Sequence, residues 1–419
     1  MKNLIYKLPL DKSIIYLMLF LLPIDMVNGF LLTNNIILPI SISQAFKMLI
    51  VLLIFLNLAQ YPKQFFLSIF IILVLMVPSF FQLFKNLDFS LLMNDLIKIT
   101  KYVIPIFAFL FFRNYLKKDT SKLVFKLVNF SYFILVINIL LKHLGVGYPM
   151  YNFGDIGSKG FFYAGNEVSA LLLILSSIVS FNLWKRNKFF YVLMALFNIV
   201  VALSIASKTS VFGVILIHIL IPIKRPTIRK INLKIFANVF LVTLILLPAI
   251  VYYGWSYVKA SSIYNRLYYF YDKFDFLTFI LSNRNVFLKD SLQVYLQEYN
   301  FLEKIIGVGQ TSYEQMNHLK LVEIDVVDIF FAYAFIGLFL FIFALLFVGV
   351  QAVIFSKNIE KYLYANFVLM MLLILFVISS TAGHVFSSGM AGIYIGLIFS
   401  LFYISKASCK NEVLSQELQ

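Results

Sequence analysis

Charged residues are scarce in this sequence. They make up 13% of its 419 residues, whereas hydrophobic residues make up 62%. Many of the apolar runs reach the length of about 20 residues that a helix needs to cross a bilayer. The scarcity of charge therefore argues against a soluble domain and predicts an all-α, polytopic integral membrane protein.

Cysteine is nearly absent as well. The single cysteine, Cys409, lies in the C-terminal tail, which excludes a disulfide framework and a thiolate metal cluster. No group of histidines and carboxylates has metal-ligand spacing. The segment Gly307-Val-Gly309 lacks both the lysine and the strand-turn-helix context of a nucleotide-binding loop, so it is interpreted as a turn or a close backbone approach. We expect no cofactor.

The charge that is present is mostly positive. The formal net charge is +16, and the lysines and arginines form short clusters between the apolar runs. Cytoplasmic loops of membrane proteins have this pattern, so we attribute the positive charge to topology and expect no nucleic-acid partner. Lys2, Lys7 and Lys12 precede the first apolar run without a small-residue cleavage site, which indicates a retained first helix.

The apolar runs predict about twelve transmembrane helices. Their expected ranges are 13–32, 45–60, 64–84, 97–116, 124–142, 165–184, 188–206, 209–223, 235–255, 326–355, 362–380 and 384–404. The chain thus divides into transmembrane helices over 1–255, a long extracytoplasmic loop with interfacial helices over 256–325, transmembrane helices over 326–404 and a cytoplasmic tail over 405–419.

The distribution of cations sets the expected orientation. If the loops alternate sides from an inside N-terminus, 21 of the 35 lysines and arginines lie inside, and seven of the remaining 14 belong to the one long loop. This bias places both termini in the cytoplasm. The polar segments 145–165, 207–210, 256–327 and 379–384 then all face outward.

The long outer loop combines aromatic residues with cations. Its tyrosines and phenylalanines suit either interfacial helices or stacking against sugars. Arg284 can offer a phosphate two parallel hydrogen bonds, or it is a solvated loop charge. Arg266 is a second candidate for binding substrate.

Three carboxylates close this loop where an apolar helix, expected to run without interruption, begins near Ile324. They are Glu323, Asp325 and Asp328. Asp325 and Asp328 are spaced to share one helix face, and a carboxylate there can act as a general base for a hydroxyl. The alternative is helix capping.

Other outward polar residues are candidates for binding substrate. Lys208 either holds an anionic group or snorkels at the interface. Lys159 precedes an apolar helix, and Asn166 and Glu167 lie at its beginning. As an alternative to binding substrate, Asn166 and Glu167 can cap that helix. His384 follows small residues at a helix end, where a lone histidine often satisfies only a local hydrogen bond.

The order of these segments resembles that of a known family. The segments are Gly160-Phe-Phe-Tyr-Ala-Gly-Asn-Glu167, Ser207-Lys-Thr-Ser210, the Arg284 segment, Gly307-Val-Gly309 and Glu323-Ile-Asp-Val-Val-Asp328 followed by Ala334-Phe-Ile-Gly337. Together they resemble the O-antigen ligase and polymerase superfamily, and within it the Wzy-type polysaccharide polymerases.

The resemblance implies a metal-independent membrane glycosyltransferase of GT-C-like architecture. It would polymerise undecaprenyl-diphosphate-linked repeat units into O-antigen or capsular polysaccharide at the outer face of the bacterial plasma membrane. Arg284 and Lys208, helped by His384, would hold the lipid diphosphate, and Glu323 or Asp325 would contact the acceptor. The expected partners are these lipid-linked oligosaccharides, membrane lipid and a chain-length regulator.

Two alternatives remain. The ligase branch of the superfamily has an arginine where this chain has Lys208 and a catalytic histidine near Glu323 and Asp325, which favours polymerase over ligase. A flippase for the same lipid-linked sugars would need charges in the middle of several helices. Asp25, in the first span, is the main residue of that kind.

Overall fold

The computed structural model describes residues 10–36, 38–117, 121–151, 153–223, 271–318, 320–358, 360–381 and 383–405, together with residues 264 and 268. Within these residues the secondary structure is helical apart from two isolated bridges, Tyr148 with Gly160 and Tyr151 with Ile156. The all-α prediction is therefore confirmed.

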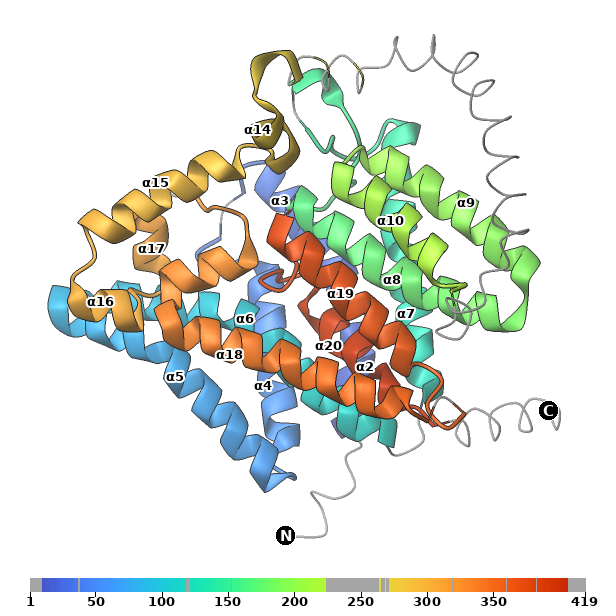
Figure 1. Cartoon of the computed structure of the whole chain (residues 1–419), viewed down its shortest axis with the longest axis horizontal. Helices are drawn as coiled ribbons and strands as arrows, with labels where there is room; N and C mark the ends of the chain where they lie inside the picture. Colours follow the sequence, from blue (N-terminus) through green and yellow to red (C-terminus); the bar gives the residue numbers. More distant parts are fainter. Residues whose placement is uncertain are drawn as a thin grey trace.

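The helices follow the apolar runs of the sequence (Figure 1). They are α2 (Leu10–Met18), α3 (Leu21–Thr33), α4 (Ile42–Leu58), α5 (Pro62–Asn86), α6 (Phe89–Lys117), α7 (Ser121–Leu140), α8 (Gly165–Arg186), α9 (Lys188–Ile205), α10 (Lys208–Leu220), α14 (Phe276–Leu281), α15 (Arg284–Gln297), α16 (Phe301–Ile306), α17 (Gln310–Met316), α18 (Asp325–Ser356), α19 (Ala365–Thr381) and α20 (Gly392–Ser400), with short 3-10 turns at Leu141–Leu144, Phe153–Asp155 and Leu401–Tyr403.

Several of these helices are long and apolar enough to cross a membrane. Five described helices meet this criterion, and the pair α2 and α3, bent by 41°, meets it together. Shorter apolar helices, among them α4, α10 and α19, accompany them. The chain is a multi-pass membrane protein. The predicted span 235–255 lies outside the described residues.

The predicted span 384–404 is only partly helical. Residues 383–391 form turns, and α20 begins at Gly392. The reason is that the backbone N–H groups of Val385, Phe386 and Ser387 donate to the carboxylate of Asp325 and so are not available to a helical ladder.

The helix α18 is broken, which corrects the expectation of an uninterrupted helix. Ala334 has φ 46° and ψ −140°, and the carbonyl of Ala332 accepts hydrogen bonds from the N–H groups of Val308 (3.1 Å) and Gly309 (2.8 Å). A Cβ on Gly307, whose φ is +94°, would collide with this carbonyl. The Gly-Val-Gly segment is therefore the insertion that kinks α18.

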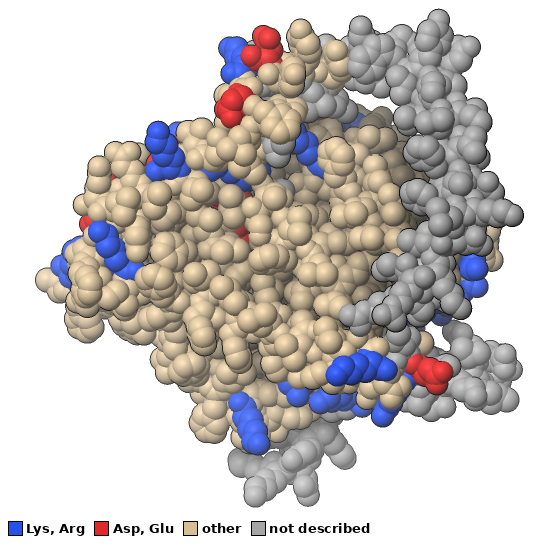
Figure 2. Space-filling view, viewed as in Figure 1, with Lys and Arg blue, Asp and Glu red and all other residues tan. Residues whose placement is uncertain are grey.

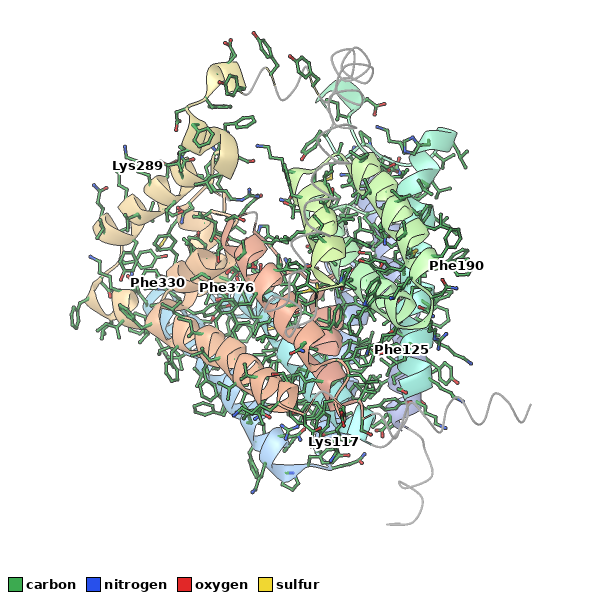
Figure 3. All side chains as sticks on the ribbon, turned by 45° about the vertical axis from the view of Figure 1, so that its right-hand side comes forward. Lys117, Phe125, Phe190, Lys289, Phe330 and Phe376 are labelled. Carbon is green, nitrogen blue, oxygen red and sulfur yellow. The ribbon has the colours of Figure 1, made fainter. Side chains whose placement is uncertain are left out.

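Two of the loop segments lie together at one end of the molecule. Figure 1 shows α14 and the connection between α7 and α8 together at that end, and Figure 3 shows Lys289 of α15 toward this end and Lys117 of α6 at the other. Lysine and arginine side chains lie near the top, the bottom and the side edges of the face in Figure 2, while the broad surface between them is mostly uncharged. This distribution is typical of a membrane-embedded belt.

Candidate functional site

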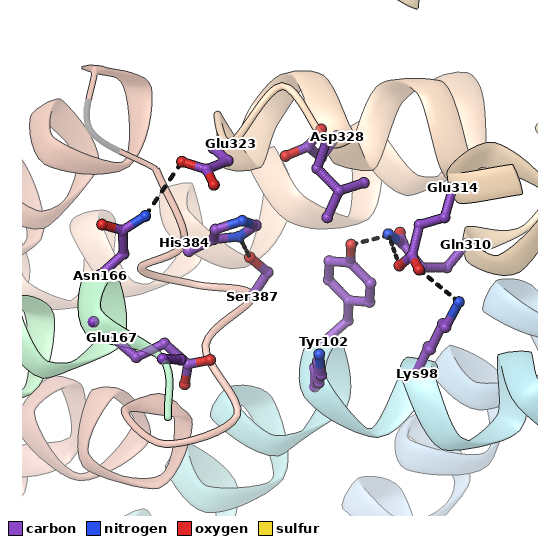
Figure 4. A pocket seen from close by; sticks show the side chains of 14 residues that line it. Lys98, Tyr102, Asn166, Glu167, Gln310, Glu314, Glu323, Asp328, His384 and Ser387 are labelled. Atoms are coloured by element: carbon purple, nitrogen blue, oxygen red, sulfur yellow. Dashed lines mark hydrogen bonds and ion pairs between the residues drawn. The ribbon is translucent and has the colours of Figure 1, made fainter. Parts of the chain in front are cut away.

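A cavity of about 300 Å³ lies between α6, α8, α17, the segment before α18 and the loop before α20. Figure 4 shows Asn166, Glu323 and His384 on one side and Tyr102 and Glu314 on the other. The full lining is Lys98, Lys101, Tyr102, Ala164, Gly165, Asn166, Glu167, Gln310, Glu314, Leu321, Glu323, Asp328, His384 and Ser387.

Arg284 and Glu323 form an ion pair at this cavity. Arg284 begins α15 and is 7% exposed. Its Nη2 donates to Oε2 of Glu323 (2.8 Å), and its Nε donates to the Glu323 backbone carbonyl (3.0 Å). Glu323 has φ 61°, a left-handed conformation that is unusual for a non-glycine residue. Held by its side chain and its backbone, Glu323 is fixed at the cavity wall.

Asp325 is fully buried, and its carboxylate holds the loop before α20 by hydrogen bonds. Its carboxylate accepts hydrogen bonds from the Ser379 hydroxyl (2.7 Å), the Ser387 hydroxyl and the backbone N–H groups of Val385 (2.9 Å), Phe386 (2.8 Å) and Ser387 (3.3 Å). With five donors around two oxygens, Asp325 is a structural acceptor in this geometry, and it does not line the cavity.

Asp328 does line the cavity and is 2% exposed. Its Oδ1 accepts hydrogen bonds from the Tyr313 hydroxyl (2.7 Å) and the Val322 N–H (3.0 Å), whereas its buried Oδ2 has no partner in the described part of the chain. Burial, and after it the neighbouring Asp328 charge, raises the pKa of Tyr313. The tyrosine therefore remains a hydrogen-bond donor to Asp328.

The first turn of α8 reaches across the cavity. Nδ2 of Asn166 donates to Oε2 of Glu323 (3.2 Å). Oε2 of Glu167 accepts from the Ser388 hydroxyl (2.6 Å) and from the Met390 N–H (2.8 Å). The residue preceding α8, Ala164, makes no side-chain cap. Both side chains thus connect α8 to other segments of the site and do not cap their own helix.

His384 completes this side of the cavity. It has φ 48°, and its Nδ1 lies 3.2 Å from the Ser387 hydroxyl. The same loop carries the Asp325 and Glu167 contacts, so three predicted residues, Glu167, Asp325 and His384, meet at residues 384–390. Asp328 lines the same cavity.

Besides Asp325 and Arg284, two described residues that were predicted to bind substrate, Lys208 and Lys159, do not line the cavity. Nζ of Lys208 donates to the Phe279 carbonyl (2.6 Å) and lies 4.1 Å from the Phe279 ring, which connects α10 to α14. Nζ of Lys159 donates to the Tyr163 carbonyl (3.0 Å), and burial lowers the pKa of Lys159. Arg266 lies outside the described residues.

The wall made by α6 and α17 was not predicted. Oε2 of Glu314 accepts from Nζ of Lys98 (2.8 Å), its Oε1 accepts from Nε2 of Gln310 (2.9 Å), and the Tyr102 hydroxyl donates to Oε1 of Gln310 (2.8 Å). Lys98 and Lys101 fall within the predicted span 97–116. Lysines three positions apart inside an apolar span are a signal of a functional site that could have located this wall.

The sequence of the C-terminal third matches a known family model. Residues 271–407 match the model described as O-antigen ligase like membrane protein. This part of the chain is similar to that family. The resemblance to the O-antigen ligase and polymerase superfamily is thereby confirmed. No curated protein and no solved structure gives a significant match.

The matched segment, residues 271–407, contains only part of the cavity and its surroundings. It includes Arg284, Glu323, Asp328 and His384. Two other walls of the cavity are formed by the first turn of α8 and by the stretch of α6 from Lys98 to Tyr102. Both precede the matched segment in the chain. The site is therefore assembled between the matched segment and the N-terminal helices.

Proposed function

We propose that this protein is a membrane glycosyltransferase that polymerises lipid-linked oligosaccharides into an O-antigen or capsular polysaccharide at the outer face of the plasma membrane. The donor is a glycan carried on undecaprenyl diphosphate, and the acceptor is a sugar hydroxyl of a second lipid-linked unit. In the transfer, the hydroxyl oxygen bonds to the anomeric carbon as the bond from that carbon to the diphosphate breaks. The hydroxyl proton leaves, and the lipid diphosphate carries the negative charge away.

One observation carries the proposal: Asn166, Glu167, Glu323, Asp328 and His384, from three distant segments, line a single cavity, and Arg284 adjoins it through Glu323. Sugar recognition needs polar side chains that donate and accept hydrogen bonds, and this cavity has several. The family match to O-antigen ligase like membrane proteins supports the same substrate class.

The proposed roles follow from the contacts. Arg284 supplies positive charge at the cavity edge, where the donor diphosphate develops charge in the transition state. Glu323 and Asn166 are proposed to orient the acceptor hydroxyl. Asp325 is proposed to act indirectly, since its oxygens hold the loop that carries His384. Lys208 is proposed to position α14, which precedes Arg284 in the chain.

A ligase is the second candidate, because the matched family model is described by that activity. A ligase would transfer the finished polysaccharide to a lipid acceptor only once. The two reactions share the donor and differ in the acceptor. They therefore make different products from the same cavity.

The test is an assay with purified protein in lipid nanodiscs. Undecaprenyl-diphosphate-linked repeat units, given without metal or nucleotide, are expected to yield a ladder of products. Transfer only to an added lipid A-core acceptor would support the ligase, and transport across vesicle membranes without chain extension would support a flippase. Arg284→Gln should retain single repeats, with Lys289→Gln as a charge-matched control on the exposed face of α15.

A further inference from the structure

His384 is held on both sides at the wall of the cavity. On one side, Gly383 (φ +70°) packs so closely against Glu323 that a Cβ would collide with the Glu323 carbonyl. On the other side, the next two backbone N–H groups donate to the Asp325 carboxylate. His384 itself has φ 48°, a conformation that persists in a non-glycine residue only when its surroundings impose it. The ring therefore has a defined place, between Glu323 and Ser387 (Figure 4).

A chain of hydrogen bonds joins this ring to a buried carboxylate. The Ser387 hydroxyl donates to Oδ1 of Asp325, and its oxygen lies 3.2 Å from Nδ1 of His384. A hydroxyl has one proton to donate, and here that proton points to a carboxylate that can only accept. The bond between Ser387 and the ring therefore takes its proton from Nδ1. In a neutral imidazole the other nitrogen, Nε2, then carries the lone pair.

Nε2 is the unused end of this chain of hydrogen bonds. His384 lines the cavity, and within the described residues only its Nδ1 is hydrogen-bonded. His218 differs in both respects: it is buried among helices, its Nδ1 lies 2.7 Å from the Val214 carbonyl, and its Nε2 lies 3.0 Å from the Ser180 hydroxyl. His218 is thus a structural residue, whereas His384 has an unprotonated nitrogen that a ligand in the cavity can use.

The charges around His384 suit a residue that becomes positive. The titratable groups that line the cavity with it are Glu323 and Asp328 near the start of α18, Glu167 on α8, Glu314 on α17 and Lys98, Lys101 and Tyr102 on α6. Glu167 and Asp328 accept hydrogen bonds only from neutral donors. Because the carboxylates outnumber the lysines, positive charge that develops on His384 is stabilised, whereas the entry of a phosphate beside it is opposed. A neutral sugar hydroxyl suits these surroundings.

We propose that Nε2 of His384 accepts the proton of the acceptor hydroxyl, and that Ser387 and Asp325 are positioning residues that fix the ring and its tautomer. This proposal rests on the proposed glycosyltransferase function and names the group that takes the hydroxyl proton. As the hydroxyl oxygen bonds to the anomeric carbon, its O–H bond breaks and the proton moves to Nε2. The bond from that carbon to the diphosphate breaks, and its electron pair leaves with the lipid diphosphate. The imidazolium then releases the proton to water.

The first experiment measures the tautomer. Nitrogen NMR of the full-length protein in lipid nanodiscs, with isotope-labelled histidine and at a pH where the imidazoles are neutral, distinguishes protonated from unprotonated ring nitrogens. The signals that disappear in His384→Gln are expected to show a protonated Nδ1 and an unprotonated Nε2. Ser387→Ala should shift the ring toward the other tautomer. A proton on Nε2 in the original protein would overturn the proposal, and an unchanged tautomer in Ser387→Ala would overturn the role of Ser387.

The second experiment measures the rate of glycan transfer between lipid-linked repeat units in the same nanodiscs. His384→Gln is expected to slow transfer by about 100-fold or more, while binding of undecaprenyl diphosphate stays within about threefold. Ser387→Ala should slow transfer by about 10-fold, the effect of one lost hydrogen bond to a charged ring, and Ser387→Thr should restore most of the rate. His143→Gln is the control, since His143 also contacts a serine, Ser204 at 3.0 Å, but does not line the cavity.

The outcomes separate this proposal from the function on which it rests. A normal rate of transfer by folded His384→Gln protein would overturn the role of His384 and leave the proposed function intact. A loss of undecaprenyl diphosphate binding as large as the loss of rate would assign His384 to the donor and also overturn the proposal. If the original protein transfers glycan to no acceptor, the proposed function fails and this proposal fails with it, whichever tautomer is measured.

Discussion

Arg284 and Glu323 are 39 positions apart in the chain, and two hydrogen bonds join them, one to the Glu323 carboxylate and one to its backbone carbonyl. The first depends on the glutamate charge and the second does not. The arginine therefore retains one anchor when the carboxylate is removed. This difference makes the pair suitable for a double-mutant cycle.

We expect Arg284→Gln and Glu323→Gln to be non-additive. The carboxylate is 38% exposed, so the interaction is weaker than a fully buried pair, with a coupling of about 1 kcal/mol. Thermal unfolding of both single variants and the double variant in detergent would measure it. Strictly additive shifts in melting temperature would show that the pair contributes nothing to stability.

Asp325→Asn should lower stability strongly. The change replaces one acceptor oxygen by an NH₂ group in front of backbone donors, and each buried donor left unsatisfied costs about 1 to 3 kcal/mol. We expect a total loss of about 3 kcal/mol or more, seen as a lower melting temperature. Asp290→Asn, on the exposed face of α15, is the matched control and should change little. A normal melting temperature for Asp325→Asn would contradict the structural role.

Gly307→Ala should destabilise more than Gly145→Ala. Both glycines have positive φ, 94° and 78°, but a Cβ at Gly145 meets no atom within 4 Å, whereas one at Gly307 collides with the Ala332 carbonyl. Gly145→Ala should cost about 1 kcal/mol through backbone conformation alone. Gly307→Ala adds the collision and should cost several kcal/mol, measured by the yield of folded protein and by melting temperature. Equal costs would rule out close packing against α18.

The stability contributed by Glu303 should depend on pH. Burial opposes its ionisation, but hydrogen bonds from Lys85, the Asn300 N–H and Gln82 together outweigh burial and lower the pKa of Glu303 from its ordinary value. A lowered folded-state pKa stabilises the protein above the unfolded-state pKa, and this stabilisation is lost as the pH falls through the folded-state value.

The comparison is between the original protein and Glu303→Gln. The difference in melting temperature should be largest near pH 7, should shrink below about pH 4.5 and should disappear at still lower pH. A difference that is constant from pH 7 to pH 3 would show that the ionisation of Glu303 is not coupled to folding.

Much of the fold could be predicted because hydropathy is a local signal. The apolar runs located the long helices, and the expected helix start near Ile324 is confirmed, since α18 begins at Asp325. The break between α2 and α3, within the predicted span 13–32, was missed because Leu19 and Phe20 are as apolar as their neighbours.

The site was only partly predictable, because its contacts join distant positions. Charge and position identified Glu323, Asp328 and His384, which line the cavity. The contacts of Glu314 with Lys98 and of Glu167 with Ser388 span 216 and 221 positions, and no local pattern gives such pairings. The same holds for Asp325, whose sequence position resembles that of Asp328, although the donors around it come from residues 379–387.

The hydrogen bonds that the Ala332 carbonyl accepts join α18 to the turn at residues 307–309. Because this carbonyl accepts from Val308 and Gly309, the turn at 307–309 and the short stretch of α18 before the kink should move as one body. Asp328 belongs to that body, whereas Glu167 belongs to the helical bundle. The position of Asp328 at the cavity wall therefore depends on the two hydrogen bonds that the Ala332 carbonyl accepts.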